Sequence, residues 1–340
     1  MIRVGLIGTG HWGPNVANSF KATGRAEITW ICDAHPDVMD ALAKSYPRAR
    51  TTVDYLDVIA DPAVDAVAVV TPTVTHFDIA RRALNAGKHV LVEKPITTDV
   101  AQTEALIASA KKAGRVLMVG HVFSYNATVL ALKDLVRGNA LGRISHLNLV
   151  TTNLGPVRTD VSALWDLASH DVYMMMELLD EQPESVSAVG RSYLNSDVED
   201  VVFSTFIFPS GVIAHVHASW LDPRKVRQIT VVGDRKMAVW DDLNAAEPIR
   251  VFDKHVETPP CGTLEGAVAE YKTLVIDAGS QVIEVAQNRP LQAECEHFVD
   301  CIEKNLKPRS DGYVGLAVVR ALLAAQESMH RGGAPVAIGR

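Results

Sequence analysis

The chain opens with Ile2-Arg-Val-Gly-Leu-Ile-Gly-Thr-Gly-His-Trp-Gly-Pro-Asn-Val-Ala-Asn-Ser-Phe20, and the expected architecture follows from this stretch. Its apolar start, Val4–Ile7, predicts a short buried strand, and after Pro14 apolar residues recur at the spacing of a helix. The pattern G-x-G-x-x-G lies between the two. A strand, a tight glycine turn and a helix in this order are typical of the unit that holds the pyrophosphate of a dinucleotide.

The three glycines of this pattern have separate predicted roles. Gly8 permits the turn, Gly10 lets backbone amides approach the phosphates, and Gly13 lets helix and strand pack closely. The helix N-terminus adds free N–H groups and a partial positive charge. Pro14 suits an early helical position because no N–H is needed there. The predicted cofactor-binding loop also contains Thr9, His11 and Trp12.

An acidic residue, Asp33, stands where the side chain that binds the ribose of the dinucleotide is expected. The segment Ile28–Asp33 predicts a second strand, and it ends in Asp33 about 20 residues after the glycine turn. A carboxylate there can bind the ribose and repels a 2′-phosphate, which favours NAD over NADP. His35 and Arg48 do not stand directly beside Asp33, as an arginine of an NADP site would. The alternative is a solvated carboxylate at a strand end, but the context favours the ribose role.

Length and composition describe an ordinary globular chain with two domains. With 340 residues the chain exceeds one typical core. Hydrophobic residues at 48% and charged residues at 21% are ordinary values, and the net charge of −7 argues against nucleic acid or an anionic membrane as partner. No apolar run has the length of a membrane span, and the N-terminus runs straight into a strand without a signal-peptide pattern. We therefore expect a cytoplasmic protein.

The cysteines agree with this expectation. None of them has metal-ligand spacing to another, and two that share a predicted helix point to different faces. We interpret all of them as reduced thiols of a cytoplasmic protein and expect no metal site. The cysteines are Cys32, Cys261, Cys295 and Cys301.

Strand and helix patterns alternate along residues 1–121, which we take as the first domain. Strands that are apolar throughout and joined by helices indicate a parallel sheet buried on both faces, with right-handed crossovers. The expected class is therefore α/β, with a Rossmann-type doubly wound sheet. Beyond the two strands named above, the predicted strands are 66–70, 89–92 and 116–119, and the predicted helices are 36–44, 54–60, 75–86 and 99–113.

Ligands of such sheets bind beyond the carboxyl ends of the strands. Five segments follow strand ends, and one cleft could collect all of them: Gly8–Gly13, Asp33, Thr71–Thr73, Glu93–Pro95 and Gly120-His121. Besides the glycine loop and Asp33, the predicted cofactor contacts are Thr71, Pro72, Thr73, the following His76, Glu93, Lys94, Pro95 and His121.

Lys94 carries the first chemical hypothesis. It ends a buried strand and stands between Glu93 and Pro95. A lysine held beside a cleft can donate a hydrogen bond to a substrate oxygen, and partial desolvation lowers the pKa of such an amine toward a useful range. The alternative is a lysine paired with Glu93 at the rim of the sheet, and spacing alone does not separate the two.

The character of the chain changes after Val122, and we take residues 122–340 as a second, α+β domain. Long β segments joined by close turns predict a large, mostly antiparallel sheet. The segment 213–220 alternates poorly, which subunit packing on a second sheet face would explain, so we expect a homo-oligomer, a dimer or tetramer. The predicted strands are 144–153, 185–194, 201–208, 212–220, 226–232 and 237–240; the predicted helices are 125–137, 172–179, 294–304 and 312–330, with the last two packing back on the first domain.

A second chemical hypothesis rests on Asp166 and His170. Their spacing of four places them on one face of a helix, where the carboxylate can hold the imidazole in one orientation and tautomer. The histidine can then take or give a proton near neutral pH. A local helix pair explains the same spacing and is favoured by the sequence alone, and a metal site lacks a third ligand. Farther along, the basic cluster Arg224–Arg227 could meet substrate phosphates, although a solvated turn is the more common outcome.

Together these motifs resemble the family that includes glucose–fructose oxidoreductase, inositol dehydrogenase and related sugar dehydrogenases. The resemblance spans nearly the whole chain. It is carried by Gly8-Thr-Gly-His-Trp-Gly13, Asp33, Thr71-Pro72 with His76, Ala86-Gly-Lys-His-Val-Leu-Val-Glu-Lys-Pro95, Asp166-x-x-x-His170-Asp171 and the final helices 294–304 and 312–330.

The resemblance implies an NAD-dependent hydride transfer between nicotinamide C4 and a ring carbon of a sugar. By position, Lys94 contacts the reacting hydroxyl or carbonyl, His170 is the main acid/base, and Asp166 holds the sugar or orients the histidine. A cis peptide bond before Pro95 is implied as well. The implied substrate contacts are Lys94, Tyr125, Trp165, Asp166, His170 and Arg224.

Two segments, Trp12–Asn15 and Leu164–Ala168, look like those of family members that act on nucleotide-linked sugars, such as UDP-N-acetylhexosamine 3-dehydrogenases. Tyr125 is a departure, because many sugar-specific members carry an arginine near that position. The alternatives are an inositol or free-sugar dehydrogenase and a non-catalytic sensor that binds NAD and sugar on the same scaffold. Intact Lys94, Asp166 and His170 favour an enzyme, since a sensor need not keep proton-transfer groups.

Overall fold

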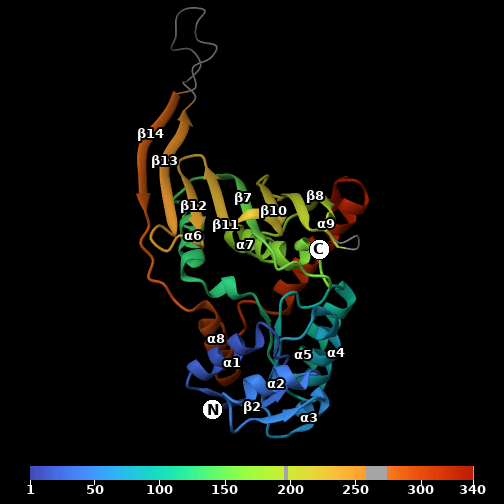
Figure 1. Cartoon of the computed structure of the whole chain (residues 1–340). Helices are drawn as coiled ribbons and strands as arrows, with labels where there is room; N and C mark the ends of the chain where they lie inside the picture. The colour runs from blue at the N-terminus through green and yellow to red at the C-terminus, as the bar shows by residue number, and fades with distance from the viewer. Residues whose placement is uncertain (195–197, 258–273, 340) are drawn as a thin grey trace, which may run out of the picture. The chain divides into compact units, whose positions relative to one another are not determined.

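A computed structural model describes residues 1–194, 198–257 and 274–339, which form two units (Figure 1). The first unit consists of Met1–Asn126 and Asn288–Leu323, and the second consists of the described residues of Ala127–Gln287 together with Ala324–Gly339. Cys261 lies outside the described residues. Within the described ranges, no helix has both the length and the apolar character needed to cross a membrane.

The first unit is built around a parallel sheet, as the sequence predicted. Six strands lie in the order β3-β2-β1-β4-β5-β6, and every neighbouring pair is parallel. Strand β4 at the centre and strand β6 at one edge are buried throughout, in agreement with their uninterrupted apolar sequences. Only β3, a short and largely exposed edge strand, was not predicted. The strands are β1 (Ile2–Ile7), β2 (Ala26–Cys32), β3 (Arg50–Thr52), β4 (Ala66–Val69), β5 (His89–Glu93) and β6 (Leu117–Gly120).

Local signals set the helix ends in this unit. The side chains of Asp54 and Asp99 accept hydrogen bonds from backbone amides in the first turns of α3 and α5, which satisfies donors that a helix leaves unpaired. Gly114 ends α5 in the left-handed conformation, with φ +60°. The helices are α1 (Gly13–Ala22), α2 (Pro36–Ala43), α3 (Tyr55–Ala60), α4 (Thr73–Asn85), α5 (Val100–Ala113) and the 3₁₀ turn η1 (Val122–Tyr125).

The C-terminal part of the chain completes the core of the first unit. Helix α8 (Pro290–Lys304) packs on α1, and the rings of Phe20 and Phe298 meet edge to face with centroids 6.0 Å apart. Leu91 of β5 and Met118 of β6 belong to the same buried cluster. This face of the sheet is therefore closed by residues from both ends of the sequence. Helix α9 (Gly312–His330) contributes to both units, since the division falls after Leu323.

The second unit contains a nine-stranded sheet in the order β14-β13-β12-β11-β7-β10-β9-β8-β15. All neighbouring pairs are antiparallel except β10 and β7, which confirms the mostly antiparallel sheet. The strands are β7 (Ile144–Leu154), β8 (Ser185–Arg191), β9 (Val201–Ile207), β10 (Ile213–Ser219), β11 (Leu221–Gly233), β12 (Met237–Asp241), β13 (Ile249–Glu257), β14 (Leu274–Val282) and β15 (Val336–Ala337).

Two long strands of this sheet, β13 and β14, were not predicted. Most of the β14 side chains are exposed, so the strand lacks the buried alternation that reveals strands in a sequence. Strand β11 also begins at Leu221, earlier than predicted, and its register with β7 shifts between Leu221 and Val226. Bulged pairing of this kind interrupts the alternation on which the prediction rested.

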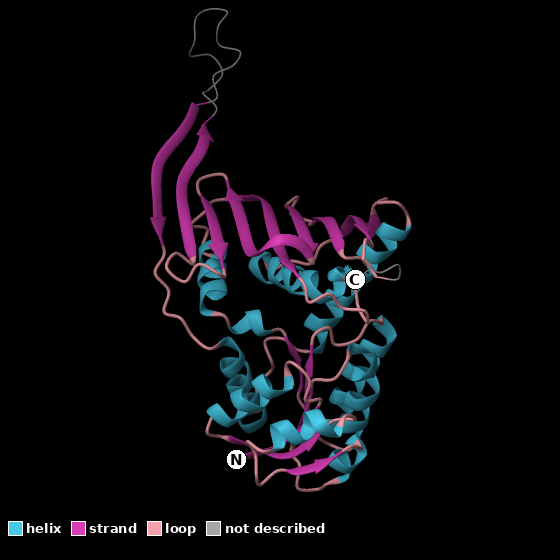
Figure 2. Cartoon of the chain, viewed as in Figure 1, coloured by secondary structure: helices cyan, strands magenta, loops and turns pink. Residues whose placement is uncertain are grey.

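Helices cover one face of the second sheet (Figure 2). They are α6 (Ala127–Arg137), a π-helical turn η2 (Leu164–Ala168) and α7 (Ser169–Leu179). The indole of Trp240 is fully buried beneath them, and its Nε1–H donates to Thr128 Oγ1 of α6 over 2.7 Å. The predicted helix 125–137 is α6, which begins two residues later than expected because the 3₁₀ turn η1 ends at Tyr125.

The closure of the first unit by α8 leads to a stability prediction. Phe298→Ala removes a fully buried ring, and we expect the free energy of unfolding to fall by about 3–5 kcal/mol. Urea denaturation followed by circular dichroism measures the change. Val74→Ala on α4 is the control, because its side chain is 77% exposed and the substitution should change stability by no more than about 0.5 kcal/mol. Equal effects of the two substitutions would contradict the packing role of α8.

Candidate active site

The glycine turn after β1 has the geometry of a phosphate cradle. Gly8 has φ +99°, and a Cβ placed on it would lie 2.5 Å from the carbonyl oxygen of Val70. A Cβ on Gly13 would lie 2.4 Å from the carbonyl oxygen of Gly8, so neither position accepts a side chain. A Cβ on Gly10 would meet nothing within 4 Å, which leaves open space in front of the first turn of α1. The pyrophosphate of NAD fits this arrangement.

Asp33 is fixed at the carboxyl end of β2 by the same turn. Its Oδ2 accepts hydrogen bonds from the Thr9 amide at 2.6 Å and the Thr9 hydroxyl at 2.9 Å, and its Oδ1 accepts one from the His35 amide at 2.9 Å. Partial burial opposes ionisation, but these donors hold the pKa of Asp33 below its usual value. The carboxylate is therefore charged, and its further lone pairs are available to ribose hydroxyls.

A carboxylate joins the glycine turn to the Glu-Lys-Pro segment. Glu93 Oε1 accepts a hydrogen bond from the indole Nε1–H of Trp12 at 2.8 Å, and Oε2 accepts one from the Lys94 amide at 3.3 Å. Burial raises the pKa of Glu93 to about 7, while the charge of Lys94 and the bonds from Trp12 and the Lys94 amide work against that rise. The peptide bond between Lys94 and Pro95 is cis, as the resemblance implied.

His76 joins the segments that follow β4 and β5. Its Nδ1 lies 2.9 Å from the carbonyl oxygen of Pro95, and its Nε2 lies 2.8 Å from that of Thr71. The ring is 1% exposed. A neutral imidazole has one N–H, so only one of these contacts is a conventional hydrogen bond unless the ring is protonated. His76 thus fixes two loops of the predicted site, and its contact with the cofactor stays a prediction.

Polar contacts therefore connect the segments that follow four of the parallel strands. Thr9 bonds Asp33, Trp12 bonds Glu93, and His76 bridges the loops at Thr71 and Pro95. The fifth segment begins at Gly120, where an added Cβ would lie 2.8 Å from Glu93 Oε2. Next to it His121 is buried, and this burial together with the charge of Lys94 lowers the pKa of the imidazole to about 3.

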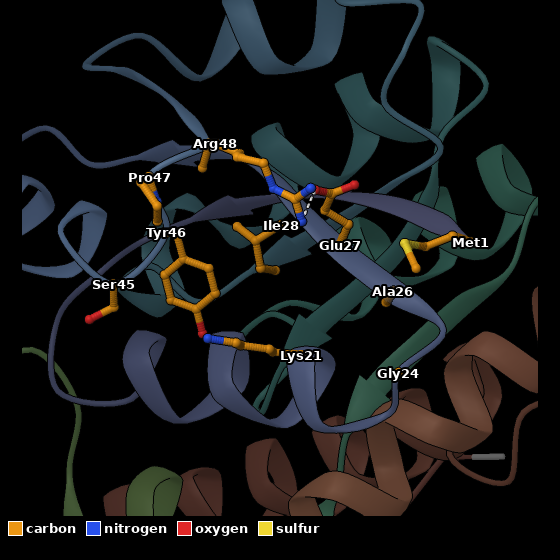
Figure 3. A pocket seen from close by; sticks show the side chains of 11 residues that line it. Met1, Lys21, Gly24, Ala26, Glu27, Ile28, Ser45, Tyr46, Pro47 and Arg48 are labelled. Atoms are coloured by element: carbon orange, nitrogen blue, oxygen red, sulfur yellow. Dashed lines mark ion pairs between the residues drawn. The ribbon is translucent and has the colours of Figure 1, made fainter.

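A half-open cavity of the first unit lies elsewhere. It has a volume of about 360 Å³ and lies near the amino ends of β1 and β2 (Figure 3). Arg48 forms an ion pair with Glu27 at 3.1 Å beside it, and the Lys21 ammonium lies 5.4 Å from the centre of the Tyr46 ring. Ligands of doubly wound sheets bind at the carboxyl ends of the strands, so we do not assign this cavity to the cofactor.

In the second unit, Asp166 and His170 lie where a π-helical turn leads into α7. Asp166 belongs to η2, and His170 is the second residue of α7. The same-face expectation assumed α-helical geometry, whereas a π turn has more residues per turn; such turns are frequent at functional sites. Asp166 Oδ1 accepts a hydrogen bond from Arg158 Nη1 at 3.2 Å. Arg158 was not selected from the sequence, because its loop carries no motif and only the fold brings it to Asp166.

Asp171, next to His170, is a further buried acid, and the sequence analysis predicted no role for it. It is 1% exposed, and its Oδ1 accepts a hydrogen bond from the Thr151 hydroxyl at 2.9 Å. Burial raises the pKa of this carboxyl to about 7, and the Thr151 bond and the charge of Arg227 oppose the shift. The sequence signal that could have identified Asp171 is its position in the Asp-x-x-x-His-Asp motif.

The remaining predicted substrate contacts lie in three different environments. Trp165 is 5% exposed, and its Nε1–H donates to Gln326 Oε1 at 2.8 Å. Tyr125 is 3% exposed, and its hydroxyl points to the Met118 sulfur at 3.8 Å, so a sugar contact would require that hydroxyl to leave its sulfur acceptor. Arg224 lies exposed on β11. The substrate contacts of all three stay predictions.

The described residues contain no group of three or more histidine, cysteine or acidic side chains arranged to hold a metal ion. The described cysteines Cys32, Cys295 and Cys301 are free and buried.

Comparison with known proteins assigns the class. Residues 2–121 match the model of an oxidoreductase family with an NAD-binding Rossmann fold, and residues 129–239 match the GFO/IDH/MocA C-terminal domain. The fold and the glycine turn therefore belong to an NAD-dependent oxidoreductase. The chain is a member of the GFO/IDH/MocA family, which confirms the resemblance and the choice of NAD as cofactor.

Individual relatives extend over most of the chain. The UDP-N-acetylglucosamine 3-dehydrogenase of Acidithiobacillus ferrooxidans is 29% identical over 327 residues, which cover 95% of each protein. A solved structure of that enzyme has a TM-score of 0.81 at 26% identity, covering 97% of this chain and 98% of the other. The structure of GenD2 from gentamicin A biosynthesis, in complex with NAD, has a TM-score of 0.83 at 25% identity, covering 100% and 97%. The inositol 2-dehydrogenase of Rhizobium meliloti is 30% identical over 207 residues, or 58% of this chain and 61% of the other.

The ribose assignment of Asp33 can be tested by cofactor binding. We expect Asp33→Ala to raise the Kd of NAD about tenfold or more, because an acceptor for the ribose hydroxyls is lost, and to reduce the preference over NADP. Fluorescence titration with both cofactors measures this. Thr9→Val is the matched control, since it removes one donor to Asp33 and keeps the carboxylate, so discrimination against NADP should persist. An unchanged cofactor preference in Asp33→Ala would refute the assignment.

Proposed function

We propose that this enzyme oxidises a secondary hydroxyl of a nucleotide-linked sugar to a ketone, with NAD as hydride acceptor, and that the UDP-N-acetylhexosamines are the substrate class. Reduction of the ketosugar would use the same residues. The single observation that carries the chemistry is the Glu93-Lys94-Pro95 segment, fixed by hydrogen bonds at the carboxyl edge of the NAD-binding sheet. The substrate class rests on the UDP-N-acetylglucosamine 3-dehydrogenase, which is similar over 95% of the chain.

The first unit would supply cofactor binding and one hydrogen-bond donor. When bound, NAD supplies the hydride acceptor. The amides of the glycine turn and the N-terminus of α1 would hold its pyrophosphate, and Asp33 its ribose. Lys94 would donate a hydrogen bond to the reacting oxygen, which stabilises negative charge on that oxygen as its proton leaves. The Glu93 bond to the Lys94 amide and the His76 contact with Pro95 support this role, because they fix the backbone on both sides of the lysine.

The second unit would supply the base. His170 would take the proton of the sugar hydroxyl during oxidation and return it during reduction. Asp166 would hold the sugar or orient the imidazole, and the Arg158 guanidinium at 3.2 Å keeps that carboxylate in place. The π-helical turn immediately before α7 supports a functional role for this segment.

An inositol or free-sugar dehydrogenase is the second candidate. The inositol 2-dehydrogenase of Rhizobium meliloti favours it, although the similarity covers 58% of this chain. The absorbance of NADH at about 340 nm, measured with UDP-N-acetylhexosamines, free sugars and inositols in competition, separates the two. Binding of NAD without turnover of any of these compounds would favour a sensor instead.

The two proposed catalytic residues, Lys94 and His170, can be removed separately. We expect Lys94→Ala and His170→Ala each to lower kcat about 100-fold or more, with the Kd of NAD nearly unchanged. Lys111→Ala is the control, because Lys111 is an exposed lysine of α5. Steady-state kinetics and NAD titration of the purified variants measure both quantities. Turnover at the wild-type rate in either variant would remove that residue from the mechanism.

We also propose that the enzyme is a cytoplasmic homo-oligomer that pairs through the second sheet. Opposite its helices, neighbouring strands place partly exposed apolar side chains in one row: Val189 is 49% exposed and is paired in register with Phe203, which is 41% exposed. The Phe203 ring stacks on His217 of the next strand with centroids 4.3 Å apart. A second copy of the sheet would bury this row. Free, buried thiols support the cytoplasmic location.

If two copies pair through this apolar row, a charge placed in the row should lower the mass of the protein in solution. Phe203→Glu should dissociate the oligomer, because it places a charge where two apolar surfaces meet. Size-exclusion chromatography with light scattering measures the mass of the wild type and the variant. Val74→Glu on α4 should leave the mass unchanged. A monomeric wild type at micromolar concentration would refute the proposal.

A further inference from the structure

Glu294 of α8 is a buried acid to which the proposed mechanism gives no role. It is 0% exposed, and neither carboxyl oxygen has a hydrogen-bond partner among the described residues. Its neighbours Cys295 and Phe298 belong to the apolar cluster that closes the first unit. An ionised carboxylate without donors is very unfavourable in such surroundings, so Glu294 must keep a proton or share one with a neighbour.

Glu93 is that neighbour. Side chains alternate along β5, so Glu93 lies on the same sheet face as Leu91, two residues earlier. Leu91 packs in the cluster that contains Cys295 and Phe298, which places the Glu93 side chain on the α8 face as well. Gly120 of the adjacent strand β6 leaves room there, because a Cβ at that position would lie 2.8 Å from Glu93 Oε2. The charge of Glu93 adds to burial in raising the pKa of Glu294 well above its usual value.

The two acids differ in the donors that surround them. Glu93 accepts hydrogen bonds from the Trp12 indole and the Lys94 amide, whereas no donor among the described side chains and amides reaches Glu294. Two carboxyl groups that interact in a medium of low polarity do not both ionise, and they titrate as a pair. The negative charge therefore lies on Glu93, and the proton lies on Glu294.

We propose that Glu294 is a positioning residue of the active site, which donates its proton to Glu93 and thereby holds the Glu93 carboxylate between Trp12 of the glycine turn and the amide of Lys94. The proposal rests on the proposed function for the role of Lys94, but the protonation of Glu294 does not. Glu294 acts on the Lys94 amine through the Glu93 carboxylate, and the proposal gives it no contact with substrate or cofactor.

Other ionisable groups of the described residues interact with this pair or with Lys94. Lys94 is the neighbouring cation, and its charge favours the ionised form of Glu93. His121 is neutral at pH 7, because the pKa of its imidazole is lowered to about 3. Burial, Glu294, Glu93 and Glu296 raise the pKa of the Cys295 thiol well above its usual value, so this thiol is neutral too.

The sign of the pH dependence follows from the raised pKa values. A carboxyl whose pKa is higher in the folded than in the unfolded protein binds its proton more tightly when folded. Its contribution to stability is complete below the unfolded pKa of about 4.3, and it is lost as the pH rises through the folded pKa. For Glu93 the loss should therefore run from about pH 4.3 to about pH 7, where its folded pKa lies.

The protonation can be measured in the protein without substrate. Infrared difference spectra at pH 7 should show the C=O stretch of a protonated carboxyl in the wild type, and Glu294→Gln should remove one such group. Asp171→Asn calibrates the background, since Asp171 in the second unit has a pKa of about 7 and contributes to the same band. An unchanged band in Glu294→Gln would overturn the proposal.

The positioning role is tested by two variants of similar size. Glu294→Gln keeps a donor toward Glu93, so the Kd of NAD and kcat should stay within about twofold of wild type. Glu294→Leu has no donor, and we expect the Kd of NAD to rise or kcat to fall about tenfold. Glu294→Leu should nevertheless unfold at or above the wild-type temperature at pH 8, because a buried ionisable group is replaced by an apolar one.

The outcomes separate this proposal from the proposed function. Wild-type NAD affinity and kcat in Glu294→Leu would refute the positioning role. A loss in Glu294→Gln equal to that in Glu294→Leu would also refute it, because rescue by the amide would be missing. If Lys94→Ala instead keeps wild-type turnover, the mechanism fails while the infrared result on Glu294 still stands.

Discussion

The close approach of backbone atoms at Gly8 and Gly13 is the constraint on which the first unit depends. With no side chain at either position, the turn after β1 lies directly against the segment after β4 and against the start of α1. Two consequences follow from this contact. The amide of Thr9 reaches Asp33 at the end of β2, and the indole of Trp12 reaches Glu93 at the end of β5. A bulkier turn would displace both groups, so the ribose ligand and the Glu-Lys-Pro segment depend on the same two glycines.

Charge is distributed unevenly along this edge of the sheet. Asp33 is held ionised by the amides around it, whereas burial makes Glu93 and Glu294 reluctant to ionise and keeps His121 neutral. Lys94 stands beside these groups, and its charge favours the ionised form of Glu93. An ammonium in such surroundings can respond to charge that develops on a substrate oxygen.

The sequence predicted the elements whose signals are local. Uninterrupted apolar strands, the glycine pattern and Asp33 could be found because each is a short stretch of chain. Strand β14 was missed because its side chains are mostly exposed, and the π turn before α7 was missed because its residues read as an ordinary amphipathic helix. Arg158 and Glu294 could not be identified as site residues from the sequence. Arg158 is linked to the site by its hydrogen bond to Asp166, and Glu294 by its interaction with Glu93, which is distant in sequence. The roles of Lys94 and His170 come from the motif positions on which the resemblance rests.

The first unit draws on both ends of the sequence, and this has a consequence for biosynthesis. Residues 1–126 leave the ribosome before the 161 residues 127–287 have been translated, and α8 follows only then. At typical elongation rates the delay is roughly ten to thirty seconds. During that time α8 is absent, so the face of the sheet that Phe298 covers in the folded protein has no cover from that helix. Synthesis of the nucleotide-binding unit therefore begins first, but the unit is complete only near the end of translation.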